Sequence, residues 1–169
     1  MKIAIVHDWL TGMRGGEKCL EVFCKLYPSA DLYSLLHIPG KVSPVIESHP
    51  IHTSFIQNLP FVESKYRYYL PLMPMAIESF DFTGYDLILS SSHCVAKSVK
   101  HGPETLHICY CHTPMRYIWD QFDQYFSRET SGFIPATVMR ILRPWLQRWD
   151  ARTSRRVDHF IANSSHVQK

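Results

Sequence analysis

The order of apolar and polar positions along the chain predicts short strands that alternate with helices. Residues 3–7 (IAIVH) form a nearly continuous, β-branched apolar run, which is typical of a strand covered on both faces in a parallel sheet. Similar runs predict further strands over 31–38, 49–54, 85–90, 106–111 and 159–162. Helical spacing of apolar positions predicts helices over 17–27, 55–80, 93–100, 115–126 and 134–156. This alternation indicates an α/β protein with a Rossmann-like, doubly wound, mainly parallel sheet flanked by helices.

Two prolines interrupt the helical pattern between the third and fourth expected strands. Pro71 and Pro74 lie in the segment YYLPLMPMAIESF, residues 68–80. Because proline lacks the backbone donor and its ring clashes with the preceding turn, each one kinks a helix that runs through it. We therefore expect a bent pair of helices or a loop on the surface here.

Composition indicates one well-cored domain. The 169 residues are 46% hydrophobic and 20% charged, which suffices for one domain and not comfortably for two. The five cysteines have no regular spacing, so we expect reduced thiols rather than a disulfide framework. Neither a signal sequence nor an apolar run of about 18 residues occurs, so we expect a cytoplasmic protein, at most peripheral to the membrane. A formal charge of +3 does not indicate nucleic-acid binding.

A glycine loop follows the first expected strand and directly precedes a helix. Gly15 and Gly16 would place free backbone N–H groups beside the positive end of the helix dipole, a site that suits a phosphate or diphosphate oxygen. The spacing matches neither the dinucleotide-binding motif nor the Walker motif. A tight turn that needs positive φ angles therefore remains an equal alternative.

A second polar cluster follows the fifth expected strand, in the segment CHTPMRYIWD (111–120). Ligands of open α/β sheets bind at the carboxyl ends of strands, where His112 can hydrogen-bond a substrate hydroxyl and Arg116 can bind a carboxylate or phosphate. A structural role for the histidine is the alternative. Cys109 and Cys111 face the opposite side of the strand from His112, so the three cannot easily share a metal ion. We expect no metal, and no hydrolase motif occurs.

The segment 134–158 combines apolar residues at spacings of three and four with arginines along the edge. Arg140, Arg143 and Arg148 are the candidates for contact with an anionic membrane surface. The alternative is an ordinary amphipathic helix packed on the sheet. The two are compatible, because arginine stems reach from a packed helix to lipid headgroups.

Four segments in this order resemble the amino-terminal domain of family 4 retaining glycosyltransferases. They are residues 2–37, beginning KIAIVHDWLTGMRGGEK, then YDLILSSSHCVAKSVK (85–100), HICYCHTPMRYIWDQ (107–121) and VDHFIANSSHVQK (157–169). The nearest likeness is to bacterial mannosyltransferases that assemble O-antigen and exopolysaccharide, and it extends over essentially all 169 residues. It implies the GT-B architecture, in which two Rossmann-like domains face each other across a cleft.

The resemblance implies that residues 1–169 form the single acceptor-side domain of such an enzyme. The carboxy-terminal domain, which in the family binds most of the nucleotide sugar and carries the E-x7-E carboxylates, is absent from these residues. The end of the sequence also indicates a chain cut at a domain edge. It offers helix-capping residues with only the beginning of a helix after them: Asn163, Ser164 and Ser165.

Individual residues match the family motifs. Gly15 and Gly16 match the glycine loop that approaches the donor diphosphate, and His112 matches the histidine that lies against the donor sugar, which makes it the catalytic candidate. The residues expected around the acceptor and the cleft are Asp8, Arg116 and Asp120.

The function implied is transfer of a sugar, with mannose from GDP-mannose as the expected donor, to a lipid-linked oligosaccharide or polysaccharide precursor at the cytoplasmic membrane face. No cofactor is expected, and the isolated chain should be inactive. The alternative is a non-catalytic, Rossmann-type nucleotide-binding or regulatory module. A nicotinamide-dependent oxidoreductase fits less well, because the G-x-G-x-x-G motif is missing.

Overall fold

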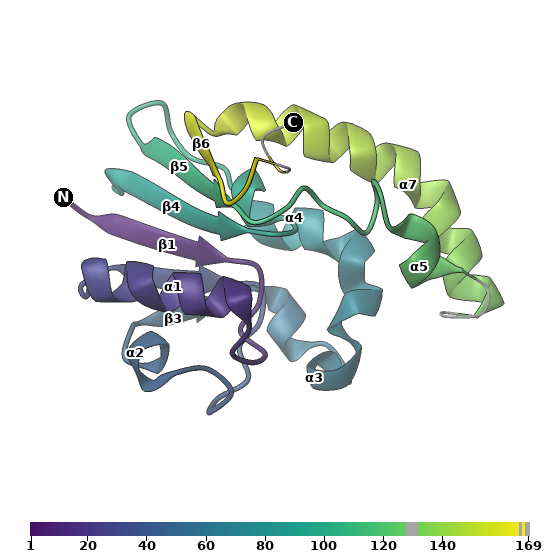
Figure 1. Ribbon diagram of the computed structural model, residues 1–169, viewed down its shortest axis with the longest axis horizontal. Helices are drawn as coiled ribbons and strands as arrows, with labels where there is room; N and C mark the ends of the chain where they lie inside the picture. The colour runs from purple at the N-terminus through teal and green to yellow at the C-terminus, as the bar shows by residue number, and fades with distance from the viewer. Residues whose placement is uncertain (128–131, 166, 168–169) are drawn as a thin grey trace.

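The computed structural model describes residues 1–127, 132–165 and 167, and in this part of the chain six strands form one parallel sheet. The sheet order is β3-β2-β1-β4-β5-β6 (Figure 1). The chain adds strands on one side of β1 up to β3 and then on the other side from β4 on, which is the strand order of a doubly wound fold. The expected Rossmann-like α/β fold is therefore confirmed. The strands are β1 (Ile3–His7), β2 (Asp31–Ser34), β3 (Ile51–Thr53), β4 (Leu87–Ser92), β5 (Leu106–Cys111) and β6 (His159–Ala162).

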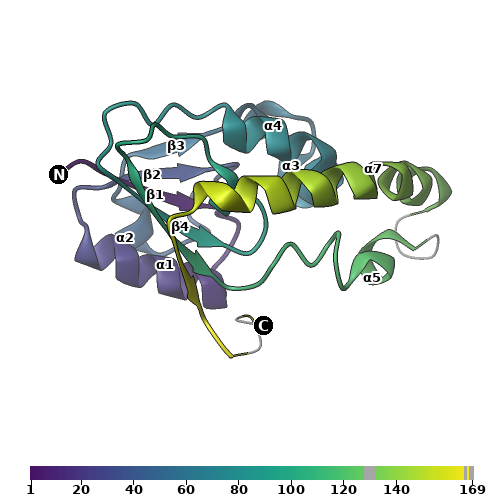
Figure 2. The same ribbon diagram turned by 90° about the horizontal axis from the view of Figure 1, so that it is seen from above.

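Helices cover both faces of the sheet (Figures 1 and 2). The α-helices are α1 (Gly15–Leu26), α2 (Pro44–Glu47), α3 (Val62–Lys65), α4 (Met73–Glu78), α5 (Phe122–Phe126) and α7 (Phe133–Thr153). Short 3-10 helices connect them: η1 (Phe55–Asn58), η2 (Tyr66–Leu72), η3 (Ala96–Ser98) and η4 (Ser154–Arg156). Helix α7 runs past the end of the strands, with α5 beside its first half.

Alternating side chains of β1 enter two different hydrophobic clusters. Ile5 packs with Leu20 of α1 and with Ile46 of α2. Val6, which points to the other face, packs with Ile77 of α4 and Leu146 of α7. Because successive side chains of a strand point to opposite faces, this central strand needs an apolar residue at nearly every position, as its sequence provides.

Strand β4 lies two residues later than expected, at Leu87–Ser92 instead of 85–90. Its last three residues are serines, and only the first of them, Ser90, was part of the expected strand. They are nevertheless buried, because each hydroxyl has a partner: Ser90 pairs with His107, Ser91 with His112, and Ser92 accepts from the backbone N–H of Lys97. A satisfied hydroxyl is tolerated inside a protein where an unsatisfied one is costly.

The expected helix over 55–80 is four short pieces, η1, α3, η2 and α4. Pro71 lies inside η2 and Pro74 lies in the first turn of α4, where its missing donor is harmless. Of the two alternatives for the segment 68–80, the structure has the bent pair of helices, η2 and α4, and not a surface loop: Leu70, Met73 and Ile77 belong to the main core.

Four other elements are shorter than expected. Strands β2 and β3 are shorter than predicted, and only 96–98 of the expected helix 93–100 is helical. Of the expected helix 115–126, only the last five residues form α5. The long helix expected over 134–156 is confirmed by α7 and η4.

All five cysteines are free thiols, and only Cys19 is not buried. Burial raises the pKa of the Cys24 thiol to about 11 and that of Cys109 to about 12, so both act as small apolar side chains. No cluster of His, Cys, Asp or Glu that would suit a metal ion occurs within the described ranges. In the same ranges, every helix is too short or too polar to cross a bilayer.

Candidate functional site

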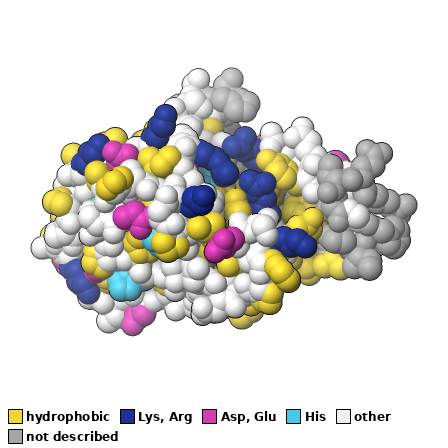
Figure 3. Space-filling view, turned by 90° about the horizontal axis from the view of Figure 1, so that it is seen from below, with side chains coloured by type: hydrophobic (Ala, Val, Ile, Leu, Met, Phe, Trp, Pro, Cys, Tyr) yellow, Lys and Arg dark blue, Asp and Glu magenta, His cyan; other side chains and the backbone are white. Residues whose placement is uncertain are grey.

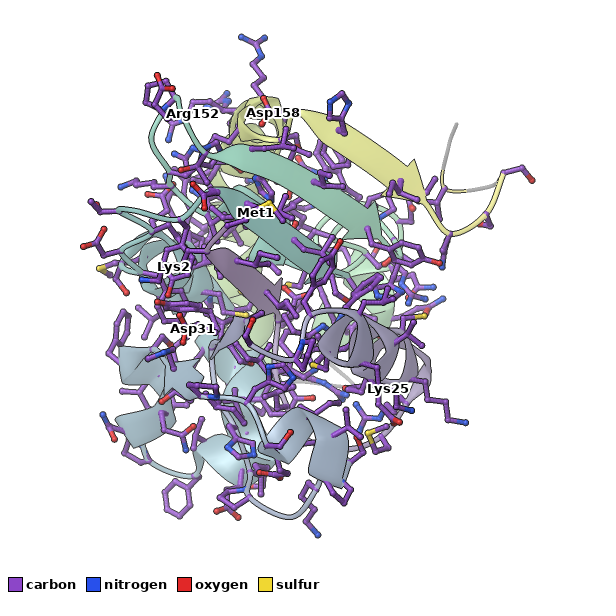
Figure 4. The ribbon with its side chains drawn as sticks, turned by 90° about the vertical axis from the view of Figure 1, so that its left-hand side faces the viewer. Met1, Lys2, Lys25, Asp31, Arg152 and Asp158 are labelled. Atoms are coloured by element: carbon purple, nitrogen blue, oxygen red, sulfur yellow. The ribbon has the colours of Figure 1, made fainter. Side chains whose placement is uncertain are left out.

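A cavity of about 560 Å³ opens at the carboxyl ends of β1 and β5. Four of the expected site residues line it: Gly15, Gly16, His112 and Arg116. The glycine turn and the strand-tip histidine, which are about a hundred positions apart in the sequence, therefore share one cavity. Residues at the beginnings of strands, such as Lys2, Asp31 and Asp158 in Figure 4, lie at the opposite end of the sheet.

The first turn of α1 lies directly over two histidine rings. A Cβ atom on Gly16 would be 3.5 Å from Cε1 of His7 and 3.8 Å from Nε2 of His112. Neither Gly15 nor Gly16 has a positive φ angle, so the turn does not explain these glycines. Their lack of a side chain keeps open the space in front of the backbone N–H groups, which have no partner within the helix. Such a turn can receive a phosphate oxygen.

Arginine is the main source of charge around the cavity. Arg14, Arg67 and Arg116 come from the residue before α1, from η2 and from the segment after β5. Figure 3 shows Lys and Arg side chains gathered near the middle of one face of the molecule. Sequence reasoning missed Arg67, because the segment 55–80 was expected as one helix and nothing placed it near the strand tips. An anionic ligand fits this arrangement.

Glu17 is the one acidic side chain that lines the cavity among the described residues, and it is only 3% exposed. Its carboxylate accepts from the backbone N–H of Arg14 at 3.0 Å and lies 4.0 Å from Nε2 of His7. Burial raises the pKa of Glu17, but the His7 ring and the N–H of Arg14 outweigh it, so the pKa is below its usual value. The negative charge of Glu17 is therefore directed toward His7 and the Arg14 N–H rather than into the cavity.

Asp8 does not face the cavity, contrary to the role expected for it. It is fully buried, and its carboxylate accepts four backbone N–H groups, those of residues 93 to 96, at 2.6–3.0 Å. Burial raises its pKa, but His93, His7 and the backbone donors outweigh burial and hold the pKa below its usual value. Asp8 therefore shapes the loop after β4, in which only 96–98 is helical.

His93 lies between Asp8 and the cavity. Its Nδ1 is 3.1 Å from Oδ2 of Asp8, and its ring stands edge-on to Trp9 at 4.5 Å between centroids. Burial lowers the pKa of His93, so the neutral ring donates from Nδ1 to Asp8. In the sequence, His93 was only the first residue of the expected helix over 93–100.

His112 is half-buried and hydrogen-bonded to Ser91, with 2.9 Å between its Nε2 and the serine Oγ. Burial, followed by the charges of His7 and His93, lowers the pKa of His112 to about 4. The ring is therefore neutral at pH 7. The roles of His7 and Ser91 beneath the ring were not recognised from the sequence, because His7 was expected as an ordinary strand residue and Ser91 only as a residue just after a strand.

Asp120 does not line the cavity. It is exposed, three residues beyond Tyr117, the last residue of the HTPMRYIWD segment to reach the cavity wall. The same Tyr117, with Arg67 and Tyr125, also lines an adjoining cavity of about 270 Å³. The two cavities are therefore neighbours that share a wall of two tyrosines and one arginine.

The three arginines expected at a membrane surface have different surroundings. Arg143 donates to the carbonyl oxygens of Ile118 and Trp119, and its guanidinium lies 4.6 Å from the Phe122 ring centroid. Arg143 therefore links α7 to the segment before α5 through hydrogen bonds. Arg140 is exposed, 3.7 Å from Asp123 at its nearest, and Arg148 is exposed as well.

The apolar residues of α7 belong to two faces rather than the single face expected. Leu146 and Trp149 are buried in the core, and Leu142 packs against it. Three others point outward and are 44–73% exposed: Val138, Ile141 and Trp145. The helix thus packs on the sheet and also presents an outer apolar stripe with arginine nearby.

Comparison with known proteins yields no match: no family model, no curated protein and no solved structure is similar to this chain. The interpretation of the site therefore depends on its geometry.

Proposed function

We propose that this chain is the amino-terminal domain of a retaining glycosyltransferase that transfers mannose from GDP-mannose to a lipid-linked oligosaccharide or polysaccharide precursor. The observation that carries the proposal is the shared cavity of Gly15, Gly16 and His112. A nucleotide sugar presents a diphosphate next to a ring of hydroxyl groups. The cavity offers N–H donors and arginine for the first and a neutral histidine for the second.

Glycosyl transfer needs the departing diphosphate to be stabilised while the sugar becomes oxocarbenium-like. Backbone N–H groups of the α1 turn and the guanidinium of Arg116 supply fixed positive charge where that negative charge develops. His112 holds a sugar oxygen in place. A second domain would close over this cavity and supply the remaining donor contacts.

The adjoining cavity supports a place for the acceptor. It is lined by Tyr68, Tyr117 and Tyr125 together with Lys65 and Arg67. Aromatic faces suit the apolar sides of sugar rings, and the two cations suit the phosphate of a lipid-linked precursor.

Two assays with radiolabelled GDP-mannose test the proposal. The full product of the gene should transfer mannose to lipid extract, and replacing His112 with Ala should lower the rate at least tenfold. Residues 1–169 alone should give no transfer. Turnover by residues 1–169 alone would refute the proposal that they are one domain of a two-domain enzyme. A full product that binds nucleotide yet transfers no sugar would instead favour the non-catalytic nucleotide-binding module.

We also propose that the outer stripe of α7 lies against an anionic membrane. Val138, Ile141 and Trp145 would enter the headgroup layer while Arg148 meets lipid phosphate. Such contact would bring a lipid-linked acceptor close to the cavity.

Sedimentation with vesicles rich in phosphatidylglycerol at low salt measures this contact. The double variant Ile141→Ser with Arg148→Gln should lose most of the bound fraction, whereas Lys41→Gln, an exposed lysine that is not on α7, should not. Equal sedimentation of all three proteins would refute membrane contact through α7.

A further inference from the structure

A line of hydrogen-bonding side chains leads from the interior of the sheet to the cavity. His7 ends β1, Ser91 lies beside it in β4, and His112 follows β5. His7 and Ser91 are both 0% exposed. The strand register places His7 directly opposite Ser91, so the contact is built into the parallel pairing of the two central strands.

The first contact fixes one hydrogen. Nδ1 of His7 lies 2.9 Å from the carbonyl oxygen of Ser91 and 3.1 Å from its Oγ. A carbonyl oxygen only accepts, so Nδ1 must carry the hydrogen and donate it. Because Nδ1 is then a donor, the Ser91 hydroxyl cannot give its own hydrogen to His7.

The second contact follows from the first. Within the described part of the chain, the other partner of Ser91 Oγ is Nε2 of His112, at 2.9 Å. A buried hydroxyl hydrogen without an acceptor is costly, so the hydroxyl gives its hydrogen to this nitrogen. Nε2 is then an acceptor, and the single hydrogen of a neutral ring must be on Nδ1.

We propose that Ser91, oriented by His7, is a positioning residue that locks His112 in the tautomer with hydrogen on Nδ1. His112 then presents an N–H donor to the cavity and cannot act as a base through Nε2, which is occupied. The ligand group that it recognises is an oxygen acceptor, a sugar hydroxyl or a phosphoryl oxygen. This last step rests on the proposed function, whereas the tautomer does not.

The charged and titratable groups nearby agree with a neutral ring. Glu17 from α1 faces His7, Asp8 from the end of β1 is satisfied by the loop after β4, His93 in that loop is neutral, and Arg116 lies on the cavity side. Burial lowers the pKa of His112 to about 4. At physiological pH the ring therefore carries a single hydrogen, on Nδ1 or on Nε2.

Long-range 1H–15N correlation spectra of the chain labelled on histidine nitrogens test the tautomer at pH 7. In the unchanged protein, His112 should show a protonated Nδ1 and a bare Nε2. Ser91→Ala should convert it to a mixture in which Nε2–H is prominent, and Ser91→Thr, which keeps the hydroxyl, should restore the original pattern.

Ser90→Ala is the matched control. Its hydroxyl pairs with Nε2 of His107 at 2.8 Å, so this variant should change the signals of His107 and leave those of His112 in place. Nε2–H as the main form of His112 in the unchanged protein would overturn the proposal, and this holds even if Ser91→Ala fails to fold. An unchanged His112 tautomer in folded Ser91→Ala would also overturn it.

Addition of GDP-mannose to the labelled full product of the gene separates this proposal from the proposed function. A shift of the His112 Nδ1 signal supports the contact with a ligand oxygen. An unmoved signal with the Nδ1–H tautomer present contradicts the ligand contact and leaves Ser91 as the residue that sets the tautomer.

Discussion

Replacing Asp8 with Asn should strongly destabilise the fold, although the change removes no volume. The two carboxylate oxygens accept pairs of backbone donors: Oδ1 accepts from Val95 and Ala96, and Oδ2 accepts from His93 and Cys94. An amide keeps one acceptor oxygen and turns an NH₂ group toward the other two donors. Two charge-assisted bonds, worth about 1.5–3 kcal/mol each, are lost, so we expect a loss of about 3–6 kcal/mol in unfolding free energy.

Urea unfolding followed by circular dichroism measures this loss. With a slope of about 2 kcal/mol per molar urea, the midpoint should fall by about 1.5–3 M. Asp120→Asn, at an exposed acid, should stay within about 0.5 kcal/mol of the unchanged protein. If Asp8→Asn were as stable as this control, the carboxylate would not organise the loop after β4. The role expected for Asp8 from the sequence, contact with the acceptor, would then be favoured again.

The pH dependence of stability provides an independent check. The pKa of Asp8 is lowered in the folded protein, so its contribution is present above the unfolded pKa of about 3.9 and disappears as the pH falls through the lower, folded value. The stability gap between the unchanged protein and Asp8→Asn should therefore narrow only in that acid range.

Three further predictions concern the site and the core. Gly16→Ala should raise the unfolding free energy by about 0.4–1 kcal/mol. It should also abolish diphosphate binding in calorimetry, because the methyl group would fill the space over the two histidine rings. Gly102→Ala, where a Cβ meets nothing within 4 Å, should leave binding intact. Lys97→Met breaks a buried ion pair and should cost about 3–5 kcal/mol in urea unfolding, whereas Lys100→Met at a surface pair should cost less than about 1 kcal/mol. Cys19, the least buried thiol and a cavity residue, should react first with a thiol reagent and be protected by GDP-mannose; equal reactivity of all thiols would contradict the fold.

The elements that sequence predicted best are those whose own residues carry the signal. The apolar run of β1 and the spacing of α7 depend on local periodicity, and both elements are present where expected. Helix α1 also follows β1, but it begins at Gly15 rather than at residue 17, so the two glycines are its first residues. The strand-tip rule also brought Gly16 and His112 into one cavity, because the parallel sheet places all carboxyl ends on one edge.

The remaining features depend on partners that are distant in the sequence. Burial of Ser91 requires two histidines, one at the end of β1 and one directly after β5, and the position of Asp8 depends on four donors more than eighty residues away. Arg67 reaches the cavity only because the chain folds back through η2. No local pattern contains such information, so the polar layer beneath the cavity became visible only in three dimensions.

Titration of the 15N-labelled full product of the gene with GDP-mannose tests the central claim most directly. The account predicts that the amide signals of Gly15 and Gly16 and the ring signals of His112 shift together and fit one dissociation constant, and that Gly16→Ala abolishes all three shifts. Signals that stay in place at millimolar nucleotide sugar, or that shift only at the amino ends of the strands, would contradict a diphosphate site between α1 and β5.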